Sequence, residues 1–265
     1  MGAKPNRIAQ SKLGMMYDIG LGAEKDTAQA AQWFRKAAEQ GDADAQSNLG
    51  LRYHYGQGVP EDYTQSVQWF RHAAEQGDVF AQYNLGMGLL LGEGVPQDYT
   101  QAVHWFRKSA EQGDAGSQSI LGLLLNSGLG FMPQDDAQSA HWYRKAAEQG
   151  DAEAQNSLGR AYEDGRGVAQ DDAEAEQWFR KAAEQGHSEA QFNLGWAYQN
   201  GRGVPQDDVE AHKWMNLAAA RTSGADQKRF ADERDAVAKK MTPDQLSEAQ
   251  TRAREWTKAF ERRKP

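Results

Sequence analysis

The chain has 265 residues, of which 39% are hydrophobic and 26% charged. It contains no cysteine, which excludes disulfides, thiolate nucleophiles and zinc–cysteine sites. The net charge of −8 is uneven: residues 223–265 carry 11 basic and 8 acidic side chains, and the rest carries 19 and 30. Because this body is acidic, it lacks the basic footprint that nucleic acid binding requires. No apolar run approaches the roughly 18 residues of a membrane span.

The first residues also lack the apolar core of a secretion signal. The compartment therefore stays open. A cytoplasmic location is expected for the sequence as it stands, and a periplasmic or secreted one if a signal precedes it.

One ten-residue segment, Trp33 to Asp42, recurs along the chain. Its copies begin at Trp69, Trp105, Trp142 and Trp178, and a partial copy begins at Trp214. Successive tryptophans are therefore 36, 36, 37, 36 and 36 residues apart. The longer step comes from one extra residue in the segment Gly128 to Pro133. A constant period of this length predicts a stack of identical structural units.

The first half of each repeat is predicted to be a helix, which we call helix A. It opens with the motif Ala-Gln-x-x-Leu-Gly, with Ser117 in place of the alanine in the fourth copy, and a Tyr or Leu follows four residues after the motif's Leu. Residues at this spacing share one helix face. The glycine of the motif lets a neighbouring helix approach closely. A later glycine is expected to end helix A in a left-handed turn, at Gly20, Gly56, Gly92, Gly128, Gly165 and Gly201.

The second half of each repeat is predicted to be helix B. An Asp stands seven residues before every Trp, and Gln or Glu follows three residues after that Asp, as in Asp26 and Gln29. This pattern predicts a capping box, in which each of the two side chains binds the other residue's backbone N–H. The Trp, a small residue three before it and an Ala four after it form the expected buried stripe. Helix B ends at a glycine such as Gly41, and Asp42 caps the next helix A. Two short antiparallel helices in each unit predict an α-solenoid.

These motifs resemble the Sel-1-like repeat family, a relative of the tetratricopeptide repeat. The resemblance covers residues 8–222 as six units at about 8–42, 43–78, 79–114, 115–151, 152–187 and 188–222. It implies an all-α, right-handed solenoid of helix-turn-helix units. It also implies binding and scaffolding roles, often in bacterial signalling, envelope or host-contact systems.

Residues 223–265 depart from the repeat and are predicted to form two capping helices. Residues 225–241 are a charged helix with Phe230, Val237 and Met241 facing inward. Thr242-Pro243-Asp244-Gln245 is a capping box with Pro at the first helical position. The apolar edge of the helix that follows is expected to cover the open end of repeat six. A coiled-coil dimer through this helix is the alternative.

The sequence contains none of the motifs of nucleotide, dinucleotide, zinc-protease or nucleophile-elbow sites, so we expect no enzyme, cofactor or metal. His104 and His141 recur at one repeat position but lack a third ligand, which favours surface residues over a metal site. A basic pair after each Trp, such as Arg35 and Lys36, either meets an acidic partner or is part of a solvated convex face.

The candidate binding residues are the helix A positions that the repeat leaves free. In the tetratricopeptide arrangement helix A lines a concave groove, and the corresponding positions lie at −2, +2, +5 and +6 from the motif's Leu. The predicted contact residues are Leu51, Tyr55, Tyr83, Met87, Leu91, Leu123, Arg160, Phe192 and Trp196. Contiguous exposed apolar side chains mark interaction sites. The alternative is that some of these positions are buried between neighbouring helices.

The sequence therefore predicts a non-enzymatic, monomeric module that binds a peptide or protein segment, with apolar anchors in repeats two to four and a polar end at repeat five. The alternative is a structural protein that associates with itself through the same patch or the C-terminal helix.

Overall fold

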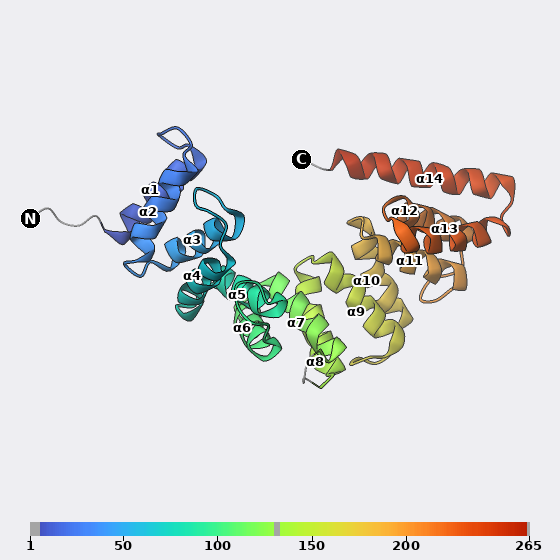
Figure 1. The fold of residues 1–265 in the computed structure, drawn as a ribbon. Coiled ribbons are helices and arrows are strands. Elements are labelled where there is room, and N and C mark those ends of the chain that lie inside the picture. The colour runs from blue at the N-terminus through green and yellow to red at the C-terminus, as the bar shows by residue number, and fades with distance from the viewer. Residues whose placement is uncertain (1–5, 130–132, 264–265) are drawn as a thin grey trace, which may run out of the picture. The chain divides into compact units, whose positions relative to one another are not determined.

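The computed structural model describes residues 6–129 and 133–263, and the described part contains 14 helices and no strand (Figure 1). The helices A are α1 (Arg7–Ile19), α3 (Ala43–Tyr55), α5 (Val79–Leu91), α7 (Ala115–Ser127), α9 (Ala152–Asp164) and α11 (Ser188–Asn200). The helices B are α2 (Thr27–Ala38), α4 (Tyr63–Glu75), α6 (Tyr99–Glu111), α8 (Asp136–Glu148), α10 (Asp172–Glu184) and α12 (Asp208–Ala220). Two tail helices follow, α13 (Gly224–Ala238) and α14 (Pro243–Arg262). The all-α prediction is confirmed.

The chain forms two compact units, residues 1–133 and 134–265. Unit 1 contains α1 to α7 and unit 2 contains α8 to α14, so the boundary falls inside the fourth repeat. It coincides with the loop that carries the extra residue, although residues 130–132 of that loop lie outside the described residues.

The starts of the helices B confirm one half of the predicted capping box and contradict the other half. The Asp before each helix B accepts a backbone N–H of the first turn, as Asp62 does from Gln65 at 2.9 Å. The reciprocal half of the capping box is wrong for helix B, because the N–H of Asp62 donates to the carbonyl of Tyr53 at the end of the preceding helix A. This bond fixes the angle between the two helices of a repeat. A reciprocal box forms only at Thr242 and Gln245 among the described helices.

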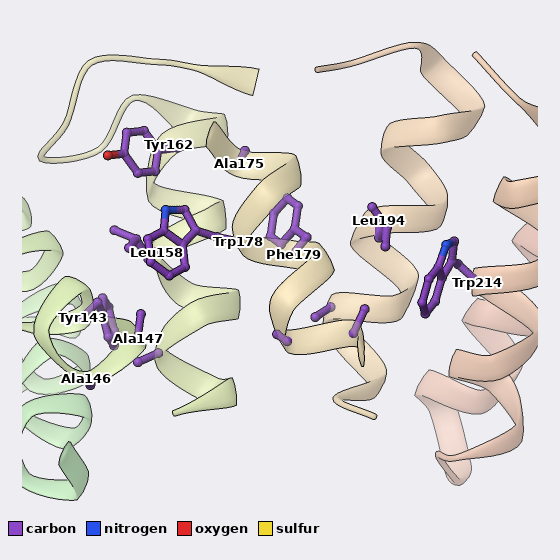
Figure 2. Close-up of a cluster of buried hydrophobic side chains, with 14 of the residues drawn as sticks. Tyr143, Ala146, Ala147, Leu158, Tyr162, Ala175, Trp178, Phe179, Leu194 and Trp214 are labelled. Carbon is purple, nitrogen blue, oxygen red and sulfur yellow. The ribbon is translucent and has the colours of Figure 1, made fainter. Parts of the chain in front are cut away.

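The core of each repeat depends on the residue after the tryptophan, which the sequence analysis did not single out. This residue is buried in every repeat: Phe34, Phe70, Phe106, Tyr143, Phe179 and Met215. In repeats one, two, three and five its ring packs on the glycine of the Leu-Gly motif, and a Cβ on Gly86 would lie 2.9 Å from the ring of Phe106. Figure 2 shows the equivalent core of unit 2 around Phe179 and Leu158. The prediction that every tryptophan is core needs correction, since Trp33 and Trp69 are only half-buried.

The second glycine of the A–B loop packs against the preceding repeat. Gly94 has φ of +72°, and a Cβ there would lie 2.2 Å from the carbonyl oxygen of Tyr63. Gly58, Gly167 and Gly203 make the same contact. The loop is therefore a second contact between repeats, in addition to the packed helices.

We expect Gly94→Ala to destabilise the protein strongly. The left-handed backbone alone costs roughly 1–2 kcal/mol, and the clash adds about 1–3 kcal/mol of overpacking. The matched control is Gly113→Ala, since Gly113 has φ of +100° and an added Cβ would meet no atom within 4 Å. Denaturant midpoints of the two variants measure the difference, and equal losses would show that the loop contact contributes nothing.

The tail packs against the last repeat at the end of unit 2. Phe230 and Val237 of α13 are fully buried, and Ala249 and Ala253 are the buried residues of α14. Trp256 of α14 packs edge-on against Trp214 with ring centroids 5.9 Å apart. These contacts hold both tail helices against α12.

Arg221 explains the departure of the sixth repeat from the consensus. It occupies the position of Gln76 and Gln112 in earlier repeats, and its guanidinium lies over the rings of Trp256 and Phe260 at 5.0 and 4.3 Å. Gln76 and Gln112 bond the buried Gln of helix A in their own repeats, whereas Arg221 joins repeat six to α14.

Candidate functional site

The positions +2 and +6 from the motif's Leu form an apolar surface on unit 1, which we call the helix-A face. Its residues are Met15, Ile19, Leu51, Tyr55, Met87, Leu91 and Leu123. Five of them are exposed: Met15 by 43%, Ile19 by 68%, Tyr55 by 61%, Leu91 by 53% and Leu123 by 54%. Within the described residues, every exposed large hydrophobic side chain belongs to unit 1.

The position two before the Leu does not belong to this surface. Ser11, Ser47, Ser119 and Asn156 are buried there, and Ser47 donates to Asp78, the cap of the next helix A, at 2.7 Å. The position faces the following repeat because successive helices A are offset along the stack. This corrects the prediction that it faces the groove.

Tyr83 occupies this inward position and is half-buried. Its ring lies 6.0 Å from that of Phe106, and a Cβ on Gly116 would be 3.3 Å from it. Burial raises the pKa of Tyr83, with a further contribution from Asp114. Tyr83 therefore joins α5 to α7 and is only an edge of the helix-A face.

The three predicted site residues of unit 2 line one pocket of about 380 Å³. Arg160 comes from α9, and Phe192 and Trp196 come from α11. Phe192 stacks on Phe230 of α13 with ring centroids 4.5 Å apart, so the cap forms part of the wall. Arg160 is exposed and makes no ion pair within the described residues.

The other arginines of this pocket are neutralised within the unit. Arg202 lies 5.3 Å from the ring of Trp196 and pairs with Asp172 at 2.6 Å and Glu163 at 3.4 Å. Arg229 pairs with Glu189 at 2.9 Å. The pocket is therefore a polar site with aromatic walls.

A glutamine ladder joins the repeats and was missed from the sequence. In repeats two to six the buried Gln of the Ala-Gln motif donates to a carbonyl of the preceding helix B, as Gln46 does to Ala38 at 3.1 Å. In repeats one, two, three and five its own carbonyl accepts from the Gln near the end of its repeat's helix B, as Gln46 does from Gln76 at 2.7 Å. The sequence contains a signal for this ladder, since both glutamines recur at fixed positions of the repeat.

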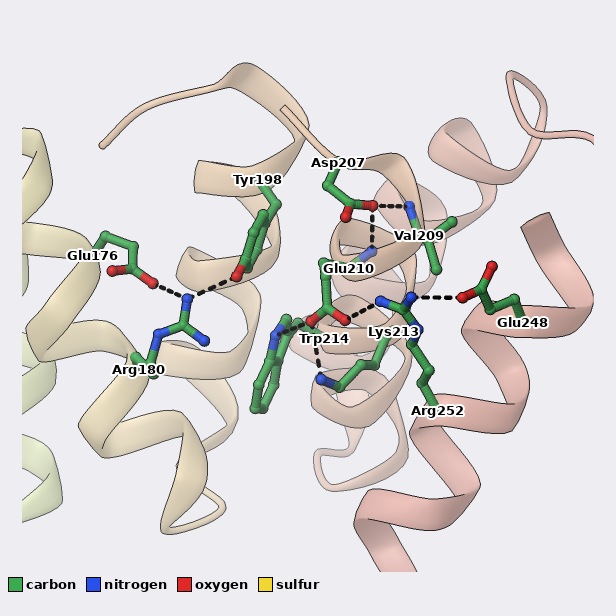
Figure 3. A network of polar contacts seen from close by, with 10 residues as sticks. All are labelled: Glu176, Arg180, Tyr198, Asp207, Val209, Glu210, Lys213, Trp214, Glu248 and Arg252. Carbon is green, nitrogen blue, oxygen red and sulfur yellow. Dashed lines mark hydrogen bonds and ion pairs between the residues drawn. The ribbon is translucent and has the colours of Figure 1, made fainter. Parts of the chain in front are cut away.

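The basic row of helix B is also largely used between repeats. Arg144 donates to the Tyr162 hydroxyl at 2.6 Å. Arg180 donates to the Tyr198 hydroxyl at 2.7 Å (Figure 3). The lysine that follows lies over a tryptophan ring, as Lys181 does over Trp178 at 3.7 Å. Arg35, Arg144 and Arg180 of the row are therefore used in contacts between repeats.

His104 and His141 are the histidines that recur at one position of the repeat. His104 and His141 each pack edge-on against the neighbouring tryptophan. Across residues 6–129 and 133–263, no group of three His, Asp or Glu side chains is placed to hold a metal ion. The described helices include none with the length and apolarity that a membrane crossing requires.

Six successive matches to the family model "Sel1 repeat" cover residues 7–42, 43–78, 79–114, 115–151, 152–187 and 188–223. The chain belongs to the Sel1 repeat family. The predicted resemblance is thus confirmed, and Sel1 repeat proteins are in general non-enzymatic scaffolds for protein–protein interaction.

Solved bacterial structures agree with this assignment. The chain is 34% identical to c5321, a protective antigen of uropathogenic Escherichia coli with an SLR fold, over 97% of this chain and 63% of that one, with a TM-score of 0.65. It therefore spans under two thirds of c5321. It is also 34% identical to a Sel1 repeat protein from Oxalobacter formigenes, over 83% of this chain and 87% of that one, with a TM-score of 0.69. No curated protein matches the chain.

Proposed function

We propose that the helix-A face of unit 1 binds an apolar segment of a partner protein, so that this Sel1 repeat protein acts as an interaction module. The observation that carries the proposal is the gathering of exposed apolar side chains at two fixed positions of α1, α3, α5 and α7. Contiguous apolar patches are rare on monomers and mark interaction sites.

The helices A of unit 2 can be compared with those of unit 1 at the two positions of the helix-A face. At the same two positions of unit 2 stand Arg160 and Asp164 in α9, and Trp196 and Asn200 in α11. These helices have the same length as those of unit 1 and likewise end at a left-handed glycine. Building a helix A therefore does not require large apolar residues there, and their presence in unit 1 supports a binding role.

We expect the double variant Tyr55→Ser, Leu91→Ser to lose binding while it keeps its helicity and melting temperature. Both side chains are more than half exposed, so their removal leaves no cavity. Anchors of this kind contribute roughly 2 kcal/mol or more each, which corresponds to at least about tenfold in affinity. The probe is a displayed library of random peptides, selected on the wild-type chain and retested on the variant.

The matched control is Ile8→Ser with Phe80→Ser, which removes two exposed apolar residues outside the helix-A face. Peptides that bind the control and the wild type but not the face variant support the proposal. Selected peptides that bind all three proteins equally contradict it.

Self-association through the same face is the competing function. Sedimentation velocity over a range of concentrations separates the two, because a monomer at all concentrations leaves the face free for a partner. A dimer that Tyr55→Ser with Leu91→Ser dissociates would instead assign the face to a second copy.

A further inference from the structure

The junctions between successive helices A differ in whether an arginine of the protein itself pairs with the carboxylates there. Between repeats one and two, Arg52 of α3 pairs with Asp18 of α1 and bonds Gln57 at 2.7 Å. Between repeats five and six, Arg202 pairs with Asp172 and Glu163. Each of these junctions is closed by a guanidinium from within the protein.

The junction between repeats two and three has no such group. In the repeat alignment Glu93 stands at the position of Arg202, Tyr63 at that of Asp172, and Gly88 at that of Arg52. A second carboxylate, Glu61, lies beside Tyr63. In the part of the chain that the structure describes, neither Glu61 nor Glu93 forms an ion pair with a Lys, Arg or His.

A small cavity lies at this junction. Its volume is about 30 Å³, and its walls include Tyr63, Ser66, Met87, Gly88 and Glu93. Ser66 is 1% exposed, and its hydroxyl has no hydrogen-bond partner in the described residues. A buried hydroxyl without a partner is costly, so its place in the wall of a cavity points to a missing donor or acceptor.

The local field favours a cation. The carboxylate of Glu61 raises the pKa of Tyr63, with smaller contributions from burial and Glu93, so both carboxylates act on the mouth of the cavity. The rings of His54 and Tyr63 meet edge-on, with centroids 5.2 Å apart, and form one wall. Aromatic rings and unpaired carboxylates together attract ammonium groups.

We propose that this cavity binds the ammonium group of a lysine side chain from the partner segment, an inference that rests on the proposed function of the helix-A face. The volume suits an ammonium, which is about the size of a water molecule, and not the larger, planar guanidinium. Its three N–H donors match the hydroxyl of Ser66 and the carboxylate of Glu93. Met87 belongs both to the cavity and to the helix-A face, so the lysine stem reaches the cavity directly from that face.

The first test uses n-butylammonium chloride as a mimic of the lysine side chain, with n-butanol as its neutral analogue. We expect saturable NMR shifts at the amides of Gly88 and Glu93 with the amine and none with the alcohol. Glu93→Arg copies the arrangement of Arg202 at an exposed site, and it should weaken amine binding by about tenfold or more. Glu75→Arg makes the same charge change at an exposed position near the end of α4 and should change nothing.

Equal shifts with amine and alcohol would show that the cavity does not select a cation, and a Glu93→Arg protein that binds the amine like wild type would show that the amine does not bind beside Glu93. Either result would overturn the inference. Ser66→Ala gives a second readout inside the cavity: the inference predicts weaker amine binding, and unchanged affinity contradicts it.

The peptide selection separates this inference from the proposed function. Two results together support both the proposed function and the lysine site. The selected peptides require Tyr55 and Leu91, and replacing a peptide lysine by norleucine lowers their affinity for the wild type but not for Glu93→Arg. Peptides that require Tyr55 and Leu91 without any lysine dependence overturn the lysine site and leave the proposed function standing. A selection in which no peptide depends on the helix-A face overturns both.

Discussion

Phe106→Ala is expected to lower the free energy of unfolding by about 3–5 kcal/mol, the usual range for removing a buried aromatic ring. Phe106 is completely buried and packs on Gly86, which has no side chain that could move into the space. The cavity would therefore persist. Because repeats are stabilised mainly by their interfaces, we expect the loss to extend to the neighbouring repeats of unit 1.

Phe106→Met is the matched control, because the sixth repeat holds the buried Met215 at this position against Gly195. A volume-conserving change of this kind costs less than about 1.5 kcal/mol. Chemical denaturation followed by circular dichroism measures both variants. If Phe106→Ala unfolds at the wild-type midpoint, the assignment of the core to the residue after the tryptophan is wrong.

Deletion of residues 223–265 is expected to lower the melting temperature and cause aggregation. The deletion uncovers Trp214, Met215 and Phe192, which pack against α13 and α14. It also leaves Glu210 without Arg252, its partner in α14 at 2.6 Å (Figure 3). Although burial opposes it, hydrogen bonds from Lys213 and Arg252 lower the pKa of Glu210. The loss of Arg252 therefore leaves a half-buried carboxylate with one cation fewer.

The double variant Trp256→Ser, Phe260→Ser tests the same contact in the full chain, because it removes only the two rings that meet Trp214 and Arg221. We expect a smaller loss of stability in the same direction, measured by thermal denaturation and light scattering. A truncated chain that stays monomeric and melts like the full chain would show that the tail is not a cap.

The sequence by itself determined the helices, their ends and the family. Those features are local: Asp at a helix start, Gly20 or Gly56 in a left-handed turn at a helix end, and apolar residues at helical spacing all act within a few residues of the chain. Because the repeat occurs six times, the positions that hold the same residue in most copies can be distinguished from those that vary.

The tertiary structure decided which of the free positions reach the surface. Ser47 and Tyr83 point into the next repeat, and Tyr55 and Leu91 point away from it, although both positions vary between repeats. The direction depends on how successive helices A pack, and contacts such as that between Ser47 and Asp78 form only when the repeats stack. Within a repeat, the backbone N–H of Asp62 bonds the carbonyl of Tyr53 and not the side chain of Gln65.

The unpaired carboxylate of Glu93 could be recognised only from the packed repeats. In the sequence it is one acidic loop residue among many, and nothing nearby along the chain distinguishes it from a solvated surface charge. Its environment comes from Tyr63 and Ser66 in the preceding repeat and from the missing side chain of Gly88. Whether a charge is neutralised depends on neighbours that the stacking of repeats brings together. Local sequence patterns therefore determined the helices of this Sel1 repeat protein, and only its tertiary structure showed which charges are paired.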